Sequence, residues 1–195
     1  MCMKLKEIHK MQPHNILERY CQQSFDKVDI LDILKRMKIQ CHCVDFSSLE
    51  STLFLSGNDN IQGIAYSEGN DLKILYSNKL NQQEINYTLA HELAHCCLHL
   101  PVSADFHVEM KTRVDYYSYN SFLFIPKKGK RAKKKEIDAD KFAANLLIPT
   151  SSLMNYLMSN SDLTSKSIAK HFDVPVELVY KKIELLNRKS KVFMR

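Results

Sequence analysis

The stretch that decides the fold is Tyr87-Thr88-Leu89-Ala90-His91-Glu92-Leu93-Ala94-His95-Cys96-Cys97-Leu98-His99-Leu100. It contains no Gly or Pro and is followed by Pro101, so we expect a helix that ends there. Residues four positions apart on a helix differ by only about 40° of rotation and one turn of rise. The imidazoles of His91 and His95 could therefore reach one Zn²⁺, the ion for which HExxH is a known binding pattern.

The glutamate of this motif has a different task from the histidines. Glu92 lies about 100° from His91 around the helix, too far to share the ligand role comfortably. It could instead stand beside the open position of the metal and take a proton from the bound water. The same pattern also arises by chance in ordinary amphipathic helices, so a third ligand is needed.

A second informative stretch runs from residue 136 to 148 and is ended by Pro149. Its apolar residues form one stripe of a predicted helix: Ala139, Phe142, Ala143, Leu146 and Leu147. Glu136 and Asp140 lie one turn apart beside this stripe, where two acids are costly unless a positive group meets them. We expect Glu136 to be the third zinc ligand and Asp140 to accept the remaining ring N–H of a ligand histidine. Alternatively, both acids merely complement the helix N-terminus, a role that fits Asp138 better.

Other residues near the motif are weaker ligand candidates. His99 stays within about 80° of the motif histidines but lies too far along the helix to share a metal with both easily. Cys96 and Cys97 should face away from the two histidines. The longer pattern HExxHxxGxxH is excluded, because the chain has Leu98 and Pro101 where that pattern has Gly and His.

Length and composition indicate a single core, with room for a small appendage. The 195-residue chain has no run of about 18 apolar residues and no apolar signal-peptide centre at its start. We therefore expect a cytoplasmic location and no membrane partner. The cysteines show no CxxC pair and are interpreted as reduced thiols: Cys2, Cys21, Cys41, Cys43, Cys96 and Cys97.

The net charge of +6 comes from one basic run. Seven of the 28 Lys and Arg residues lie between positions 127 and 135, and the other 21 nearly balance the 22 Asp and Glu residues. We interpret the run as a solvated loop that closes an irregular segment, residues 101–135. The aromatic middle of this segment, residues 114–125, could pair as a strand or pack over a cleft, and local packing is favoured over both. Its residues Tyr116, Tyr117 and Tyr119, or else His99, could supply an oxyanion donor.

The remaining N-terminal pattern predicts an α+β fold. Two short helices are expected over residues 14–36, with Asp26 or Asp29 as the cap of the second. Runs rich in β-formers predict strands over residues 39–46, 52–55, 61–66 and 72–76. The last two runs should form a hairpin of a small antiparallel or mixed sheet. Asn81 is the expected N-cap of the central helix, with Glu84 completing a capping box.

The C-terminal part, residues 163–186, is typical of a helix, a tight turn and a second helix. Pro175 suits the first turn of the second helix. That helix carries Lys181 and Lys182 but also two glutamates, so packing or protein recognition is favoured over the reading of DNA bases. We divide the chain into a metallopeptidase domain, residues 1–160, and a helical tail, residues 161–195.

With these residues in place, the chain resembles the ImmA/IrrE family of metallopeptidases. The resemblance is carried by residues 87–99 and 136–149, in that order. Residues 168–175 are similar to the helix-turn-helix-like tail of the family. The resemblance covers about residues 14–187 and is weaker before residue 60.

This resemblance implies a thermolysin-like zincin core of the gluzincin type, a small sheet with active-site helices. It assigns His91, His95 and Glu136 as ligands of Zn²⁺ and Glu92 as the catalytic base. It also implies a cytosolic, site-specific endopeptidase of bacteria, phages and mobile elements. Such an enzyme cleaves a helix-turn-helix repressor and thereby relieves repression.

Two features depart from the family pattern. The segment between His95 and Glu136 is longer than usual and contains the basic run, which leaves the shape of the substrate cleft open. Asp173 stands where such turns often have Gly, which leaves the quality of the turn open.

Two other functions also remain open. A regulatory protein could use the tail and the basic run to bind DNA, a repressor or an antitoxin without hydrolysing it, although nucleic-acid binding is less favoured. The basic run could equally steer an acidic partner or a DNA-bound repressor to an enzyme. The chain could also be the toxin or antitoxin half of a two-gene module, which its sequence does not test.

Overall fold

The structure, a computed structural model, describes residues 5–21, 27–47, 61–68, 71–99, 121–123 and 130–193. In chain order its elements are α1 (Leu5–Ile8), α2 (Pro13–Tyr20), α3 (Ile30–Arg36), β1 (Gln40–Val44), β2 (Gly63–Glu68), β3 (Asp71–Ser77), α5 (Gln82–Leu98), β4 (Ser121–Leu123), α6 (Lys130–Leu147), α7 (Thr150–Ser159), α8 (Ser165–Phe172) and α9 (Val176–Phe193). Helices pack around one small sheet, and the predicted α+β class is confirmed.

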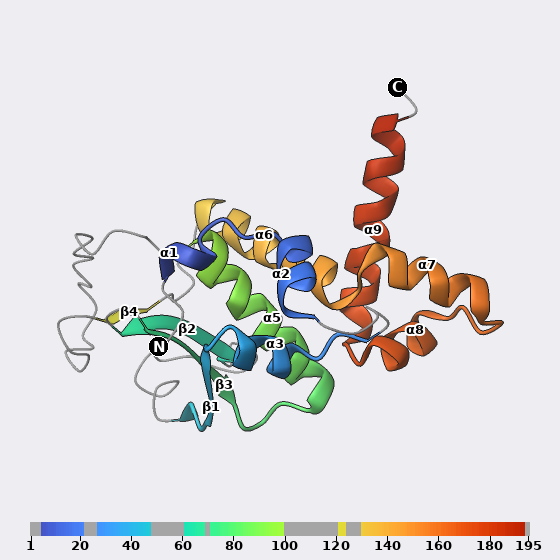
Figure 1. The fold of residues 1–195 in the computed structure, drawn as a ribbon. Helices are drawn as coiled ribbons and strands as arrows, with labels where there is room; N and C mark the ends of the chain where they lie inside the picture. The colour runs from blue at the N-terminus through green and yellow to red at the C-terminus, as the bar shows by residue number, and fades with distance from the viewer. Residues whose placement is uncertain are drawn as a thin grey trace.

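Helix α5 is the central element of the fold (Figure 1). It packs on β2 and β3 with one side and on α6 with another, so apolar and small residues are buried around most of its circumference. The predicted capping box is confirmed at its start. The Asn81 side chain accepts a hydrogen bond from the Glu84 backbone N–H at 3.0 Å, and the Glu84 carboxylate accepts one from Asn81 N–H at 2.8 Å.

The sheet is mixed, with strand order β1-β3-β2-β4. The predicted hairpin is confirmed, because β2 runs antiparallel to β3, whereas β1 runs parallel to β3. Strand β4 pairs with β2 only over Tyr66–Glu68. The beginning of β2, from Gly63, lies against α5. The predicted strand over residues 52–55 lies outside the described residues.

The two short N-terminal helices are also confirmed, as α2 and α3. Asp29 caps α3, and its carboxylate accepts a hydrogen bond from the Asp32 backbone N–H at 3.0 Å. The alternative cap, Asp26, lies outside the described residues. Helix α2 packs on α6 and α3 packs on α5, so both helices cover the central pair.

Helix α6 begins earlier than the sequence predicted. Residues 130–135 were expected to be a loop, but they form the first turns of the helix that continues through Glu136. Lys, Arg and Ala have high helix propensity, and this intrinsic preference outweighs the mutual repulsion of the charges. The prediction of a loop over these positions was therefore wrong. Lys127 and Lys128, which open the basic run, lie outside the described residues.

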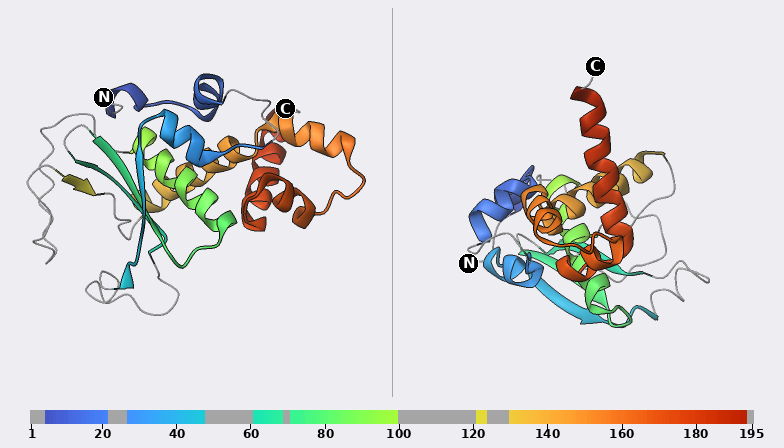
Figure 2. Two further views of the ribbon diagram at one scale, coloured as in Figure 1. Left: turned by 60° about the horizontal axis from the view of Figure 1, so that its bottom comes forward. Right: turned by 90° about the vertical axis from the view of Figure 1, so that its right-hand side faces the viewer.

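The predicted C-terminal helix, turn and helix are present as α8 and α9, and α7 precedes them (Figures 1 and 2). Asp173, between α8 and α9, adopts left-handed backbone angles, φ 55° and ψ 50°, a conformation that Gly reaches at lower cost. Asn86 of α5 secures it, because its side-chain N–H₂ donates to the Asp173 carbonyl at 2.9 Å and to its carboxylate at 3.2 Å. The turn thus forms despite its departure from the family pattern.

The tail shares the core of the molecule. Ile168, Phe172 and Leu178 belong to the same cluster of buried side chains as Leu93 of α5 and Phe142 of α6. Helix α9 packs along α6, and its C-terminal end extends beyond the rest of the molecule (Figure 2). The division of the chain at residue 160 remains a prediction.

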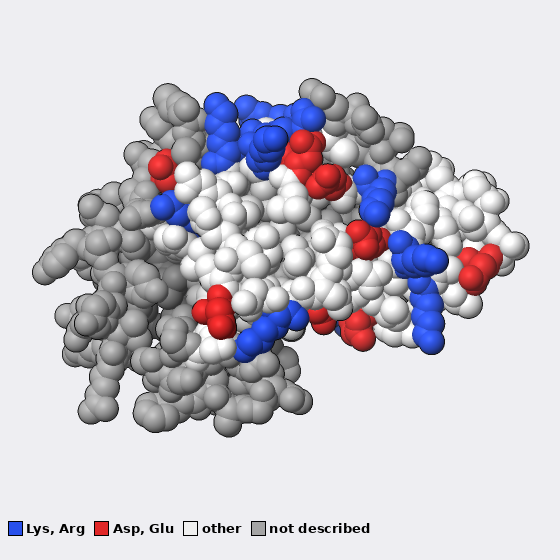
Figure 3. Space-filling model, turned by 90° about the horizontal axis from the view of Figure 1, so that it is seen from below, with Lys and Arg blue, Asp and Glu red and all other residues white. Residues whose placement is uncertain are grey.

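The surface carries both signs of charge. On the face seen in Figure 3, Lys and Arg side chains are interspersed with Asp and Glu around a centre that carries neither. Within the part of the chain that the structure describes, no helix combines the length and the apolar composition needed to cross a membrane.

Candidate metal centre

Helix α5 presents the two motif histidines from consecutive turns. Their rings are 4.8 Å apart between centroids and inclined at 66°. The Nε2 atoms of His91 and His95 are 3.1 Å apart. Because the spacing of four residues places them on one face, both nitrogens point to the same side of the helix.

Helix α6 brings a carboxylate to the same point. Glu136 Oε2 lies 3.1 Å from His91 Nε2, and Glu136 Oε1 lies 3.6 Å from His95 Nε2. One ligand atom from each of the three residues falls within 4.8 Å of the other two. Among the described residues, this is the group of His, Cys, Asp and Glu that could hold a metal ion.

The donor set fits a zinc ion. Ligand atoms of a tetrahedral zinc, each roughly 2.0–2.1 Å from the metal, lie about 3.3–3.4 Å apart. Two separations are close to that spacing, 3.1 Å between the two histidine Nε2 atoms and 3.1 Å from His91 Nε2 to Glu136 Oε2. The third, 3.6 Å, joins His95 Nε2 to the other carboxylate oxygen, Oε1. Glu136 Oε1 is also buried without a hydrogen-bond partner. A buried carboxylate oxygen normally has a partner, and a bound cation would supply one here. Two imidazoles argue against Ca²⁺ and Mg²⁺, which prefer oxygen ligands.

Asp140 makes the contact that the sequence predicted. Its Oδ1 lies 3.0 Å from His91 Nδ1 and can accept a hydrogen bond from that ring N–H, which leaves Nε2 free for a metal. Tyr87 donates its hydroxyl hydrogen bond to the same oxygen, and Lys181 of α9 binds the other oxygen. Burial raises the pKa of Asp140, but these three partners outweigh it and hold the pKa well below its ordinary value.

The motif glutamate lies on the side of α5 that faces the sheet. Glu92 is only 7% exposed and receives a hydrogen bond from the Ala65 backbone of β2. Burial raises its pKa to about 7, against the opposing effect of His91. Gly63 lies so close that an added Cβ would be 2.9 Å from Glu92 Cγ. A carboxyl with such a pKa suits proton transfer near neutral pH.

The charges of the three-residue group are strongly coupled. Burial lowers the pKa of His91, but Asp140, Glu136 and Glu92 outweigh it and raise the pKa to about 9. Burial likewise raises the pKa of Glu136, but the two imidazoles outweigh it and hold the pKa at about 2. The pKa of His95 is lowered, mainly by burial. Near neutral pH, in the absence of a metal, His91 therefore carries a proton and Glu136 carries a negative charge.

His99 lies next to the group without joining it. Its Nδ1 is 2.8 Å from His95 Nδ1, so it can fix the orientation of the His95 ring. It also lines a hollow of about 580 Å³ between the start of α2, the C-terminal end of α5 and one side of α6. Burial, followed by the charges of His95 and Lys135, lowers its pKa to about 4. The other oxyanion candidates, Tyr116, Tyr117 and Tyr119, lie outside the described residues.

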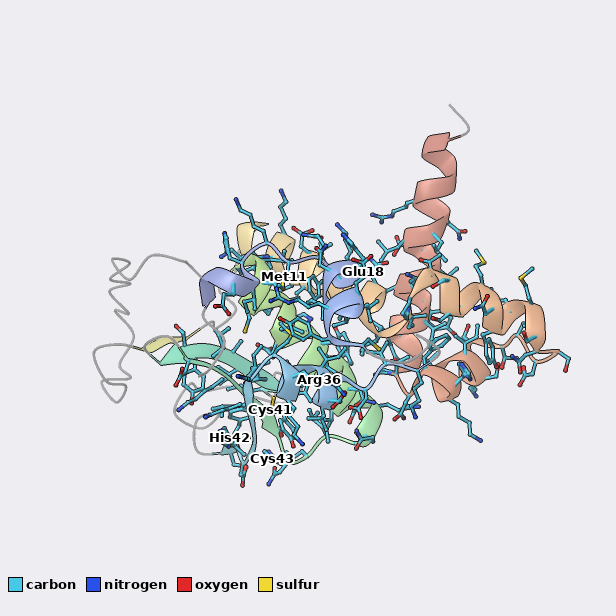
Figure 4. The ribbon with its side chains drawn as sticks, in the orientation of Figure 1. Met11, Glu18, Arg36, Cys41, His42 and Cys43 are labelled. Atoms are coloured by element: carbon cyan, nitrogen blue, oxygen red, sulfur yellow. The ribbon has the colours of Figure 1, made fainter. Side chains whose placement is uncertain are left out.

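The described cysteines stay apart from the three-residue group. Cys96 and Cys97 are fully buried in the core, on the side of α5 away from the motif histidines, as expected. Cys41 and Cys43 lie on β1 beside His42 (Figure 4). Burial raises the pKa of Cys41 to about 11. A buried thiol with a raised pKa, such as that of Cys41, is a poor nucleophile near neutral pH.

Sequence reasoning missed three contributors to this site. Tyr87 had an available signal, because it precedes His91 by four residues and so shares its face. Gly63 and Lys181 had none, since each reaches the site from an element that only the fold brings near.

Comparison with known proteins identifies one family. The model of a peptidase family, described as the IrrE N-terminal-like domain, matches residues 56–184. This range contains the three clustered residues, Glu92 and the first half of α9. No curated protein and no solved structure matches the chain.

Proposed function

The chain belongs to the IrrE N-terminal-like peptidase family, and from this premise we propose that it is a zinc-dependent endopeptidase. The observation that carries the proposal is the convergence of His91, His95 and Glu136 beside the buried Glu92. Two histidines and a glutamate are a common donor set of catalytic zinc, and a nearby carboxyl supplies the base that peptide hydrolysis requires.

The chain's own residues would divide the reaction as follows. A zinc ion held by the three clustered residues would supply Lewis acidity toward the scissile carbonyl. Glu92 would take a proton from the attacking water and deliver it to the leaving amine. Asp140 orients His91, and His99 orients His95, so both imidazoles are fixed before substrate arrives.

The proposed substrate is a helix-turn-helix repressor, and the proposed setting is the cytoplasm. Both follow from the resemblance to the ImmA/IrrE family. A protein substrate is also compatible with the basic first turns of α6, because cations there could steer an acidic partner toward the adjacent site.

Glu92→Gln provides the test. We expect the variant to retain zinc, measured by metal analysis after dialysis, and to lose cleavage of the repressor proteins encoded by adjacent genes, followed by mass spectrometry. Glu84→Gln, which changes the same side chain at the exposed start of the helix, is the matched control and should cleave normally. Equal cleavage by wild type and Glu92→Gln would refute the proposed mechanism.

The alternative of a non-hydrolytic DNA-binding protein is less well supported. Two lysines in the first half of the second tail helix are engaged within the protein, Lys181 with Asp140 and Lys182 with Asn145. A titration of duplex-DNA affinity against salt separates the two functions. A steep slope would favour the binder, and a flat one the peptidase.

A further inference from the structure

A lysine of the tail reaches the metal centre. Lys181 Nζ, on α9, lies 2.5 Å from Asp140 Oδ2 and 3.4 Å from the Tyr87 hydroxyl oxygen. The same ammonium stands over the Tyr87 ring, 5.5 Å from its centroid. Tyr87, Asp140 and Lys181 come from three different helices, and their polar ends meet beside His91.

The carboxylate of Asp140 is held at both oxygens. Oδ1 accepts from the Tyr87 hydroxyl and faces His91 Nδ1 at 3.0 Å, while Oδ2 is bound by Lys181. Rotation of this carboxylate would break both sets of contacts together. The lysine therefore restricts the one group that sets the plane and tautomer of the His91 ring.

We propose that Lys181 is a positioning residue of the metal centre, which fixes Asp140 and through it the metal-binding nitrogen of His91. The tail helix is then a structural component of the site. The inference rests on the proposed function only in taking the three-residue group as the zinc site. Zinc affinity, without any substrate, is enough to test it.

The neighbouring lysine shows why α9 should remain docked when Lys181 is changed. Lys182 is 1% exposed and donates to Asn145 Oδ1 at 2.8 Å and to Thr150 Oγ1 at 3.0 Å. Leu178 and Val179 are also buried against the core. The side chain of Lys181, by contrast, is 41% exposed. Its removal should alter the metal centre more than the packing of the helix.

The experiment measures the zinc affinity of the full chain by competition with a chromophoric chelator. Changes to groups that orient a ligand histidine cost roughly 10–100-fold in metal affinity. We expect about a tenfold loss for Lys181→Met and a loss at least as large for Asp140→Asn. Arg188→Met is the control, because it removes a cation of the same helix that pairs with Glu184 on the surface. Its affinity should equal that of the wild type.

A double-mutant cycle separates positioning from general damage. If Lys181 acts through Asp140, then Lys181→Met should weaken zinc binding no further once Asp140→Asn is present. Lys181→Arg, which keeps a cationic donor, should restore most of the affinity. Should Lys181→Met fail to fold, Lys181→Gln takes its place in the cycle.

The outcomes are distinguishable. A wild-type chain that binds no zinc would refute the proposed function itself. Two results would overturn the positioning role alone, provided that the wild type binds zinc normally. The first is equal zinc affinity of Lys181→Met and Arg188→Met, and the second is additive losses in the double-mutant cycle.

Discussion

Replacing Gly63 by alanine should press a methyl group into the helix that carries Glu92. The added Cβ would lie 2.6 Å from Thr88 Cγ2, 2.9 Å from Glu92 Cγ and 3.2 Å from Glu92 Oε1. Carbon atoms in contact are about 3.5–4.0 Å apart, so the first two distances are short by at least roughly 0.9 and 0.6 Å. Strand β2 is paired with β3, and α5 is packed against α6, so neither element can retreat freely.

Overpacking of this kind typically costs about 1–3 kcal/mol. For a chain of this size, that loss lowers Tm by roughly 2–4 °C per kcal/mol. The sign of the change in unfolding free energy is informative. At an unstrained position, Gly→Ala stabilises a protein by about 0.4–1 kcal/mol, because it lowers the conformational entropy of the unfolded chain. Displacement of Glu92 should also reduce peptidase activity, by as much as about 100-fold for a shift near 1 Å. Zinc affinity should stay near the wild-type value, because none of the three clustered residues is touched.

The assay is urea unfolding of the metal-free protein, alongside zinc affinity and cleavage rate. Thr88→Ser removes Cγ2, the atom in the shortest contact, so in the double variant it should restore part of the stability lost by Gly63→Ala. Activity should recover less, because the contact with Glu92 Cγ remains. Wild-type or higher stability of Gly63→Ala would refute the proposed crowding between β2 and α5.

Three further predictions concern the metal, the tail and the buried lysine. Zinc binding should release protons and strengthen as pH rises toward 9, because the metal requires the neutral ring of His91. Burial alone would lower the pKa of His91, but its neighbours, chiefly Asp140, raise it to about 9. Calorimetry in two buffers of different ionisation enthalpy measures the proton release, and a pH-independent affinity would contradict the prediction. Phe172→Ala, at a tail residue that is 1% exposed, should cost roughly 3–5 kcal/mol in one cooperative urea transition, whereas a separate early transition would indicate an independent tail. Asn145→Leu should cost about 1–3 kcal/mol, because it removes an acceptor from the buried ammonium of Lys182, and unchanged stability would exclude that role.

The parts of the fold that were predictable depend on local patterns. The capping box at Asn81 and Glu84, the hairpin of β2 and β3, and the spacing of His91 and His95 all involve residues close in sequence. Glu136 lies far from the motif in sequence. It was still predictable, because an acid beside the buried stripe of a helix requires a positive partner.

The parts that escaped prediction depend on long-range packing or on competing local preferences. Residues 130–135 carry a charge pattern typical of a solvated loop, yet the same residues are good helix formers, and that second preference prevails. Gly63 begins a strand and does not have the positive φ that marks a glycine turn. Its role arises only where β2 crosses Thr88 and Glu92.

The tail shows how one sequence pattern can serve two structural purposes. A helix, turn and helix can place a recognition helix in a DNA groove, and such a helix presents its cations to solvent. Here the second helix directs Lys181 to Asp140 and buries Lys182 against Asn145. Asn86 holds the turn itself by bonding to Asp173. Because Lys181, Lys182 and the turn are engaged with α5, α6 and the start of α7, we infer that this part of the tail acts mainly on the metal centre, where Lys181 restrains Asp140 and thereby His91.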